Sequence, residues 1–408
     1  MTLKNHQLIT TLKSLRGNAR ACVYTEPLWG IPYNLFAPYA SIYMLSLGLT
    51  DSDIGLITSI GLVFQIFWAM MSGAITDKLG RKRATLIFDI ISWSMACLVW
   101  AIAQNFTYFV VAAIFNSAWR VPMNSWQCLL VEDTEPHLLV DIYSWVHISG
   151  LMVAFVSPLA GVLIGRFTLV PTLRGIYLLA FVMMTAKFLI LNVAATETRQ
   201  GEIRMAATKD QHVLTILHGS LNVLKDVLRT PATLFTTGLM LILHICLMIN
   251  GTFWSILVTE KLQIAPQHLA LYHFVRSMTM LLFFFLVMPK LRAMEVRKPL
   301  LLGFFGLIAT QVMLISSPVK NYLWLLMATV MEGCSVPIAN TLTDKLIVIT
   351  VDPKERARIM AILYVIVIVC TSPFGWIAGQ LSEVNRSLPF ALNILLFSLG
   401  ALLTYLTR

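Results

Sequence analysis

Eight ionisable side chains lie inside long apolar stretches of the sequence, and they are the first candidates for chemistry. A charged group at the centre of a bilayer costs at least about 2.5 to 3.5 kcal/mol on insertion scales, so it usually faces a cavity or an opposite charge. Such groups bind polar solutes and carry protons. The eight residues are Glu26, Asp89, Arg120, His147, Lys187, His244, Arg276 and Glu332.

Three of these residues are the preferred candidates for substrate binding and proton coupling. Arg120 and Glu332 lie deep within their apolar stretches, near mid-membrane at a helical rise of 1.5 Å per residue. Glu26 lies in the segment YTEPLWGIPYN, whose two prolines free backbone carbonyls and bend a helix. Burial favours the neutral carboxyl group, as proton exchange requires, whereas pairing with Arg120 would keep Glu26 ionised. Both states remain open.

The other charged candidates have simpler interpretations. Lys187 and Arg276 lie close enough to a membrane face for their long side chains to reach the interface. Asp89 follows the basic residue Arg83 by six positions and is expected to pair with that basic segment.

Five uncharged or neutral side chains complete the candidate site. His147 and His244 are candidate proton relays, with hydrogen-bonded packing as the alternative. Tyr33, Asn34 and Asn124 are expected to line a cavity with aromatic and amide groups.

The elements that position these residues are apolar helices. Of the 408 residues, 58% are hydrophobic and 12% charged, whereas about a quarter of the residues in a soluble domain are charged. Continuous apolar runs of about 20 residues satisfy their backbone hydrogen bonds in lipid only as helices. We therefore predict an all-helical membrane protein with spans at 21–48, 54–76, 84–104, 107–131, 142–165, 175–195, 232–258, 268–288, 299–316, 321–343, 359–381 and 387–406.

The basic residues orient the spans. With both termini in the cytoplasm, the cytoplasmic segments hold 22 of the 30 lysine and arginine residues and the opposite side holds five, as the positive-inside rule requires. The net charge of +10 is explained by topology, and no nucleic-acid partner is implied. The short loops favour a bacterial plasma (inner) membrane, and we expect a monomer in the lipid bilayer.

The chain divides into two six-span bundles, 1–195 and 232–408, joined by a cytoplasmic linker at 196–231. An amphipathic helix on the membrane surface is expected at 212–228 of this linker. Similar segments recur six spans apart, "VPMN" with "VPIAN" and a mid-helix Ser-Pro pair at 157–158 and 372–373. Transporters commonly place their substrate between such repeats.

The segment GAITDKLGRK, between the second and third spans, carries a motif. Its pattern, Gly73, Asp77, Gly80, Arg81 and Lys82, resembles the G-x-x-x-D-x-x-G-R-K signature of the major facilitator superfamily. The twelve spans, the linker and the repeat resemble that family too. The resemblance implies that this loop latches the two halves against the start of helix eleven. Gly73 is expected to let helix two approach a neighbour closely, and Gly80 to form a tight turn.

The resemblance also bears on function. An acid in helix one together with an arginine in helix four resembles the arrangement in some proton-coupled multidrug exporters of the family. Helix five carries AFVSPLAGV, which keeps Pro158 and Gly161 of the antiporter motif and lacks its other glycines.

The sequence thus predicts a secondary active transporter that exports a small organic solute in exchange for protons. The alternatives are proton-coupled uptake of a nutrient such as a sugar or organic acid, and a non-transporting receptor or scaffold. Neither nucleophile nor nucleotide motifs are evident, and the six cysteines lack metal-like spacing. We predict no enzyme activity, no cofactor and no metal.

Overall fold

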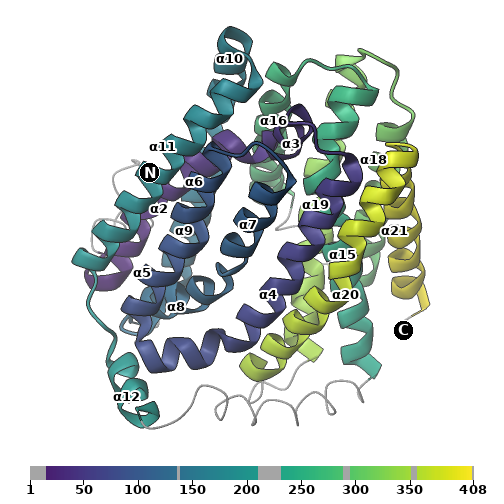
Figure 1. The fold of residues 1–408 in the computed structure, drawn as a ribbon. Coiled ribbons are helices and arrows are strands. Elements are labelled where there is room, and N and C mark those ends of the chain that lie inside the picture. The colour runs from purple at the N-terminus through teal and green to yellow at the C-terminus, as the bar shows by residue number, and fades with distance from the viewer. Residues whose placement is uncertain (1–14, 136–137, 210–230, 288–294, 351–355, 407–408) are drawn as a thin grey trace, which may run out of the picture. The chain divides into compact units, whose positions relative to one another are not determined.

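The computed structural model describes residues 15–135, 138–209, 231–287, 295–350 and 356–406 (Figure 1). Every regular element in these ranges is a helix, which confirms the predicted all-helical fold. The first half contains α2 (Gly17–Phe36), η2 (Ala37–Tyr39), α3 (Ala40–Ser46), α4 (Asp51–Leu79), α5 (Arg81–Asp89), η3 (Ile90–Met95), α6 (Ala96–Ala101), α7 (Phe106–Ser117), α8 (Arg120–Val131), α9 (Leu139–Val153), η5 (Ala154–Val156), α10 (Pro158–Phe167), α11 (Leu169–Ala194) and α12 (Arg199–Thr208).

The second half is built from longer uninterrupted helices. Its elements are α15 (Pro231–Ile256), η7 (Leu257–Lys261), η8 (Pro266–His268), α16 (Leu269–Leu286), α18 (Arg297–Ile315), α19 (Tyr322–Thr350), α20 (Arg356–Val384) and α21 (Leu388–Leu406). Within the expected linker the structure describes α12, while the amphipathic segment expected at 212–228 lies outside the described residues.

Ten helices in the described ranges are long and apolar enough to cross a membrane, and each coincides with a predicted span. The two other predicted spans, 21–48 and 107–131, form broken helices. Pro38 falls in the 3₁₀ turn between α2 and α3. Pro122 has no N–H for the carbonyl of Ala118, which accepts from Val121 at 3.0 Å where α7 ends and α8 begins. The total of twelve spans remains a prediction.

The chain packs as two compact units. The first comprises Met1–Ala37, Phe64–Leu159 and Pro171–Gly219, and the second comprises Pro38–Val63, Ala160–Val170 and Ser220–Arg408. Two short ranges from the first half of the sequence, 38–63 and 160–170, therefore pack with the second half. The predicted division into 1–195, 196–231 and 232–408 remains a prediction.

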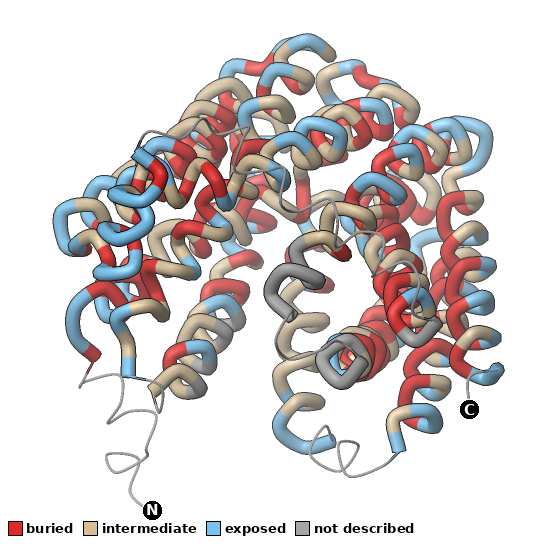
Figure 2. The backbone as a smooth tube through the Cα atoms, turned by 90° about the horizontal axis from the view of Figure 1, so that it is seen from below, coloured by how far each residue is buried: buried red, intermediate tan, exposed pale blue. Residues whose placement is uncertain are grey.

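Each unit has its own apolar contacts. In the first, α2 packs against α8 and α9, and Cys22, Leu129 and Ile142 belong to one buried cluster there. In the second, α18 packs between α19 and α21, and α15 contacts α20. Figure 2 shows buried residues following one side of many helices, with exposed residues on the other. All six cysteines lie in the described ranges and are free.

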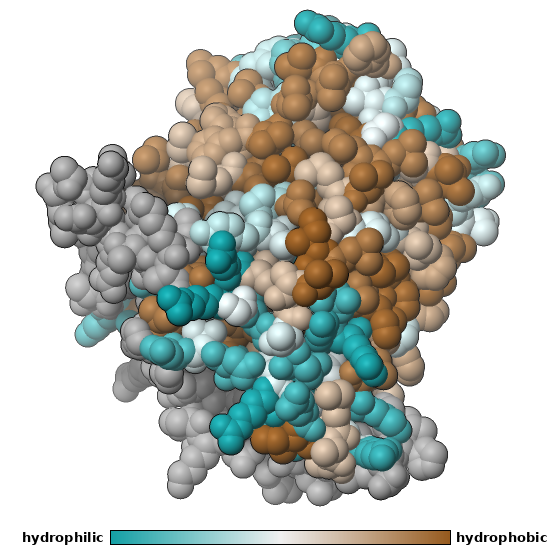
Figure 3. Space-filling view, turned by 90° about the vertical axis from the view of Figure 1, so that its left-hand side faces the viewer, coloured by the Kyte–Doolittle hydropathy of each residue, from teal (hydrophilic) through white to brown (hydrophobic). Residues whose placement is uncertain are grey.

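Large apolar side chains also lie on the outside of the molecule. On α11 the exposed set includes Leu178, Leu179, Val182, Leu189, Ile190 and Val193. Figure 3 shows one face on which hydrophobic side chains form a broad surface and hydrophilic ones gather below it. A soluble monomer rarely exposes so large an apolar area, so lipid is its natural environment.

Candidate functional site

The first unit contains an aromatic cavity of about 200 Å³ with charged groups in its wall. Four tryptophans line it, from α2, η3, the α7–α8 junction and α8. Its other lining residues include two carboxylates and one amine. The residues used below are Glu26, Trp29, Asp89, Trp93, Trp119, Trp126 and Lys187, and we call this space the tryptophan cavity.

Lys187 and Glu26 form an ion pair in the tryptophan cavity, with 2.8 Å between Lys187 Nζ and Glu26 Oε2. Lys187 is buried, and its ammonium group lies 5.6 Å from the ring centroid of Trp126 and 5.8 Å from that of Trp29. Those distances suit cation–π attraction. The sequence expectation for Lys187 was wrong, because its side chain is buried in this pair and does not extend to the membrane interface.

Asp89 lies at the end of α5 and lines the same cavity as Glu26 and Lys187. Only 7% of the residue is exposed. From the sequence, Asp89 was expected only to pair with the basic loop and was not included in the candidate site. It instead lines the cavity. Two carboxylates and one ammonium group give the cavity wall a formal charge of −1 when all three are ionised.

The ring systems of this region are ordered against one another. Trp29 stacks on Tyr33 at 4.7 Å between ring centroids, and Trp93 meets Trp29 edge-on at 5.1 Å. Tyr33 thus packs against Trp29, which lines the cavity, and its own role in lining a cavity remains a prediction. Asn34 donates to the carbonyl of Gly30 in its own helix at 2.8 Å, which uses its amide locally.

Arg120 has a different environment from the one considered for it. Its Nε donates to Gln65 Oε1 at 3.0 Å, and its guanidinium lies 4.2 Å from the Trp119 ring centroid. The acid that was considered as its partner, Glu26, pairs with Lys187. Asn124 is half-buried on α8, and its role in lining a cavity remains a prediction.

The second unit contains its own buried ion pair. Arg276 of α16 and Glu332 of α19 approach to 2.8 Å, and Glu332 is buried. Arg276 lies 5.5 Å from the Trp254 ring centroid. Arg276 was expected to extend to the interface; its guanidinium instead pairs with Glu332, with 22% of the side chain exposed.

The space beside this second pair is much smaller, about 10 Å³. Amide groups fill the neighbourhood: Asn393 Nδ2 donates to Asn250 Oδ1 at 3.1 Å and to Gln311 Oε1 at 3.5 Å. His244 of α15 lies 6.4 Å from the Tyr364 ring, centroid to centroid. His147 belongs to α9, but its side chain lies outside the described part of the chain.

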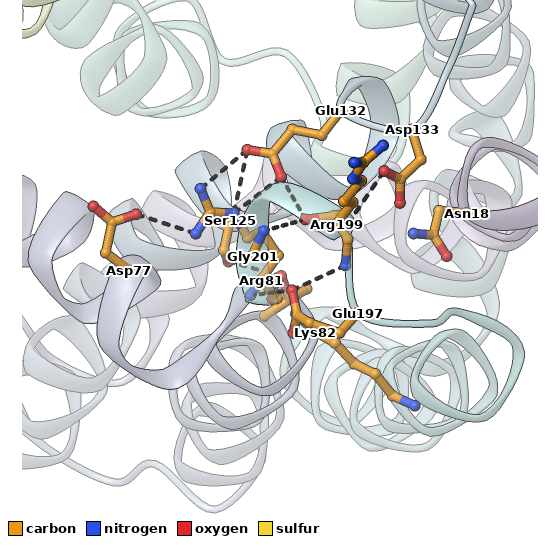
Figure 4. Close-up of polar contacts among 12 residues, drawn as sticks. Asn18, Asp77, Arg81, Lys82, Ser125, Glu132, Asp133, Glu197, Arg199 and Gly201 are labelled. Carbon is orange, nitrogen blue, oxygen red and sulfur yellow. Dashed lines mark hydrogen bonds and ion pairs between the residues drawn. The ribbon is translucent and has the colours of Figure 1, made fainter. Parts of the chain in front are cut away.

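The motif loop forms a charged cluster in the first unit (Figure 4). Arg81 is buried and contacts Asp77 at 3.1 Å and Glu132 at 3.0 Å. Glu197 accepts from the backbone N–H groups of Arg81 at 2.9 Å and Lys82 at 3.0 Å, which places an anion at the N-terminus of α5. Sequence reasoning missed Glu132 and Glu197, because both lie far from the motif loop along the chain.

Two glycines of the motif behave differently. Gly80 has φ +83°, a left-handed conformation that favours glycine, and this confirms the expected tight turn. A Cβ added at Gly73 would meet nothing within 4 Å, so no close approach is seen at that position among the described residues. The expected contact with the start of helix eleven involves residues 351–361, whose side chains lie outside the described part.

Helix five keeps the expected proline and glycine. Pro158 begins α10, where its missing N–H costs no hydrogen bond. A Cβ at Gly161 would lie 2.2 Å from the carbonyl oxygen of Gln267, so only glycine fits this close approach.

Ten apolar helices with charged pairs buried among them define an integral multi-pass membrane protein. Residues 29–372 match the family model described as Major Facilitator Superfamily, so the chain belongs to that family. It is a membrane transporter of small solutes and not an enzyme, as the sequence predicted.

Solved structures share the fold at low sequence identity. The nucleoside transporter NupG has a TM-score of 0.70 at 14% identity, covering 96% of this chain and 98% of that one. A POT family transporter in complex with 5-aminolevulinic acid has a TM-score of 0.72 at 12% identity, covering 97% and 98%. The human organic anion transporter MFSD10 (TETRAN) has a TM-score of 0.59 at 15% identity, covering 99% and 100%.

A curated relative matches only part of the chain. The quinolone resistance protein NorA of Staphylococcus aureus is 29% identical over 82 residues. The match covers 20% of this chain and 21% of that protein.

Proposed function

We propose that this protein exports a small amphipathic organic molecule in exchange for protons, by alternating access. The observation that carries the proposal is the tryptophan cavity, which combines flat aromatic walls with an acid pair and one lysine. Aromatic faces attract both flat rings and cations. The solute that fits this chemistry has a flat ring and a positive charge.

Asp89 is the acid that we assign to coupling. Glu26 already pairs with Lys187 at 2.8 Å, which leaves Asp89 to supply the unbalanced negative charge of the cavity. A solute cation and a proton each neutralise that charge, so binding of one opposes binding of the other. Such competition is the thermodynamic requirement for exchange of the two.

The similarity to NorA over 82 residues supports the export proposal, because that relative is described as a quinolone resistance protein. The cluster of Asp77, Arg81, Glu132 and Glu197 supports a second part of the proposal, that the motif loop controls conformational exchange. We further propose a plasma-membrane location with both termini in the cytoplasm, from the distribution of basic residues.

The test is proton movement in proteoliposomes that contain a pH-sensitive dye. Flat organic cations, nucleosides and organic acids are added in turn to the purified full-length protein. We expect flat cations to drive proton flux opposite to their own flux. Flux of both in the same direction would instead establish uptake by symport, and cation movement without proton flux would contradict coupling through Asp89.

A further inference from the structure

In the second unit, the backbones of α4 and α20 touch. A Cβ at Gly55 would lie 2.5 Å from the carbonyl oxygen of Gly375 and 2.7 Å from Cα of Gly379. Real side chains do not tolerate such distances, so these three glycines are what permits the contact. The contact lies at the end of the second unit that carries Asp51. We call this end of the unit the Asp51 end.

Helix α20 is continuous where it meets α4, but one of its carbonyls lacks the usual backbone donor. Pro373 has no N–H, so the carbonyl of Val369 lacks its usual helical donor. The hydroxyl of Ser372 donates to that carbonyl at 2.9 Å instead. One turn of α20 is thereby held by a side chain, which is a recognised cause of helix bending.

Ser59 of α4 enters the next turn of α20. Its Oγ accepts from the backbone N–H of Trp376 at 2.7 Å and donates to the carbonyl of Ser372 at 2.5 Å. These two backbone groups are four residues apart, the donor and acceptor that bond to each other in a regular α-helix. A hydroxyl from α4 therefore bonds to both the donor and the acceptor of one helical turn of α20.

This bridge can be removed without leaving a buried polar group unpaired. If α4 withdraws, the Trp376 N–H and the Ser372 carbonyl can bond directly. The Ser59 hydroxyl can turn to the carbonyl four residues back, as Thr58 already does with Ile54 at 2.9 Å. An unpaired polar group is costly in an apolar environment. A contact with this property can separate and re-form without that cost.

Polar groups at the Asp51 end close the same two helices. Asp51 is buried and accepts from Ser382 at 2.6 Å and from Arg386 at 3.3 Å. Arg386 also lies 3.6 Å from Glu260. These residues line a cavity of about 660 Å³, which gives water access to the charges when the helices part.

We propose that Ser59 is a removable bridge in the backbone of α20. When inserted, it holds α4 and α20 together and closes the Asp51 end. When it is withdrawn, the Trp376 N–H and the Ser372 carbonyl bond only within α20, and the Asp51 end can open. This inference goes beyond the proposed export function, because it holds for any solute and any coupling ion.

The test measures closure of the Asp51 end by cross-linking. Reporter cysteines replace Ser52 and Gln380, whose side chains touch across the two helices, in full-length protein with its six native cysteines replaced. A short bifunctional thiol reagent then reports the closed fraction. In this background we compare Ser59→Ala with Thr58→Ala, which removes a neighbouring hydroxyl bonded within its own helix.

We expect Ser59→Ala to lower the cross-linking rate about five-fold or more, because two hydrogen bonds between the helices are lost. Thr58→Ala should stay within about two-fold of the parent, since its bond is local. Equal rates for the two variants, or faster cross-linking in Ser59→Ala, would overturn the proposal. Thermal unfolding of each variant excludes a general loss of folding as the cause.

A second variant addresses the glycine contact. A Cβ at Gly379 would lie 2.9 Å from the carbonyl oxygen of Asp51, so Gly379→Ala should lower the rate more than Ser59→Ala does. Gly175→Ala is the control, because a Cβ there meets nothing within 4 Å. A Gly379→Ala protein that cross-links like the parent would also overturn the proposal. The assay uses no substrate and no proton gradient, so its failure is separable from failure of the export function.

Discussion

The buried ion pairs of the two units differ in what surrounds them. In the first unit, Lys187 and Glu26 share a cavity of about 200 Å³ with a further acid, Asp89. In the second, Arg276 pairs with Glu332, and Glu332 borders a space of about 10 Å³ that is also lined by amides. Both cations lie against tryptophan rings. The pairs themselves are alike, and the difference lies in the empty volume and the extra charge.

A buried ion pair alone is therefore weak evidence for a binding site. A closed pair neutralises itself and can serve only the fold, because its charges are already matched. Where a further acid and an empty volume lie beside the pair, that acid can bind a solute cation or a proton. From this contrast we propose that the first unit binds the solute and that the second-unit pair mainly stabilises the fold, and experiments can test each part.

The largest effect is expected for Asp89→Asn. Removing the unbalanced charge takes away the group at which proton and solute cation compete, so we expect counterflow of a flat cation to fall about 100-fold, the usual scale for losing a proton-transfer group. The measurement is initial proton flux in proteoliposomes. Glu202→Gln, an exposed acid on α12, is the matched control, and a variant of Asp89 with normal flux would remove this acid from the site.

Trp29→Ala should weaken solute binding about ten-fold, since an aromatic contact contributes roughly 1 kcal/mol beyond its area and its burial contributes further. Trp29→Phe keeps a ring over Lys187 and should lose less than three-fold, by the same reasoning. Titration calorimetry on protein in nanodiscs measures both. If the two variants bind equally weakly, ring stacking is not what holds the solute.

Glu332→Gln tests the structural assignment of the second unit. It leaves the Arg276 charge without its partner, so we expect about 2 to 3 kcal/mol of destabilisation, the low side for a broken buried pair because Arg276 is partly exposed. Thermal unfolding measures this, and the double variant with Arg276→Gln should regain stability. Transport lost as fully as in Asp89→Asn, with stability intact, would move the binding site to include this pair.

The smallest effect is expected at the motif loop. Glu132→Gln weakens the contact at 3.0 Å with Arg81 but leaves that of Asp77, so we expect turnover to fall about three-fold to ten-fold, as for one weakened charge-assisted bond. Solute affinity should not change. Arg83→Gln, an exposed basic neighbour, is the control, and reduced affinity in Glu132→Gln would argue against a purely conformational role.

The helices themselves were predictable because lipid imposes length and composition on any spanning segment. The span expected at 54–76 is α4, Asp51–Leu79, and the ends differ by only three residues each. The tight turn at Gly80 was predictable for a similar local reason. By contrast, the breaks at Pro38 and at Ala118 depend on how neighbouring turns satisfy their carbonyls, which an apolar pattern does not encode.

The partners of the buried charges were not predictable. Lys187 and Arg276 pair with carboxylates because they lie on the helix faces that meet Glu26 and Glu332. A helix that is apolar all round does not show from its sequence which face meets a neighbouring helix. Ser59 and Gly55 gave no signal either, because their roles exist only through the backbone of α20. Sequence reasoning singled out Glu26 and Glu332 as acids within apolar spans but did not predict their partners, Lys187 and Arg276.

The most direct test of the account is the pH dependence of binding of a flat organic monocation, in the parent protein and in Asp89→Asn. A proton neutralises the Asp89 carboxylate, so the Kd of the parent should rise as pH falls. The rise should be up to about ten-fold per pH unit in the range where Asp89 is mostly protonated. In Asp89→Asn this dependence should vanish and binding should be weak at every pH. A variant that binds tightly with the parent's pH dependence would contradict the assignment of solute and proton to the tryptophan cavity.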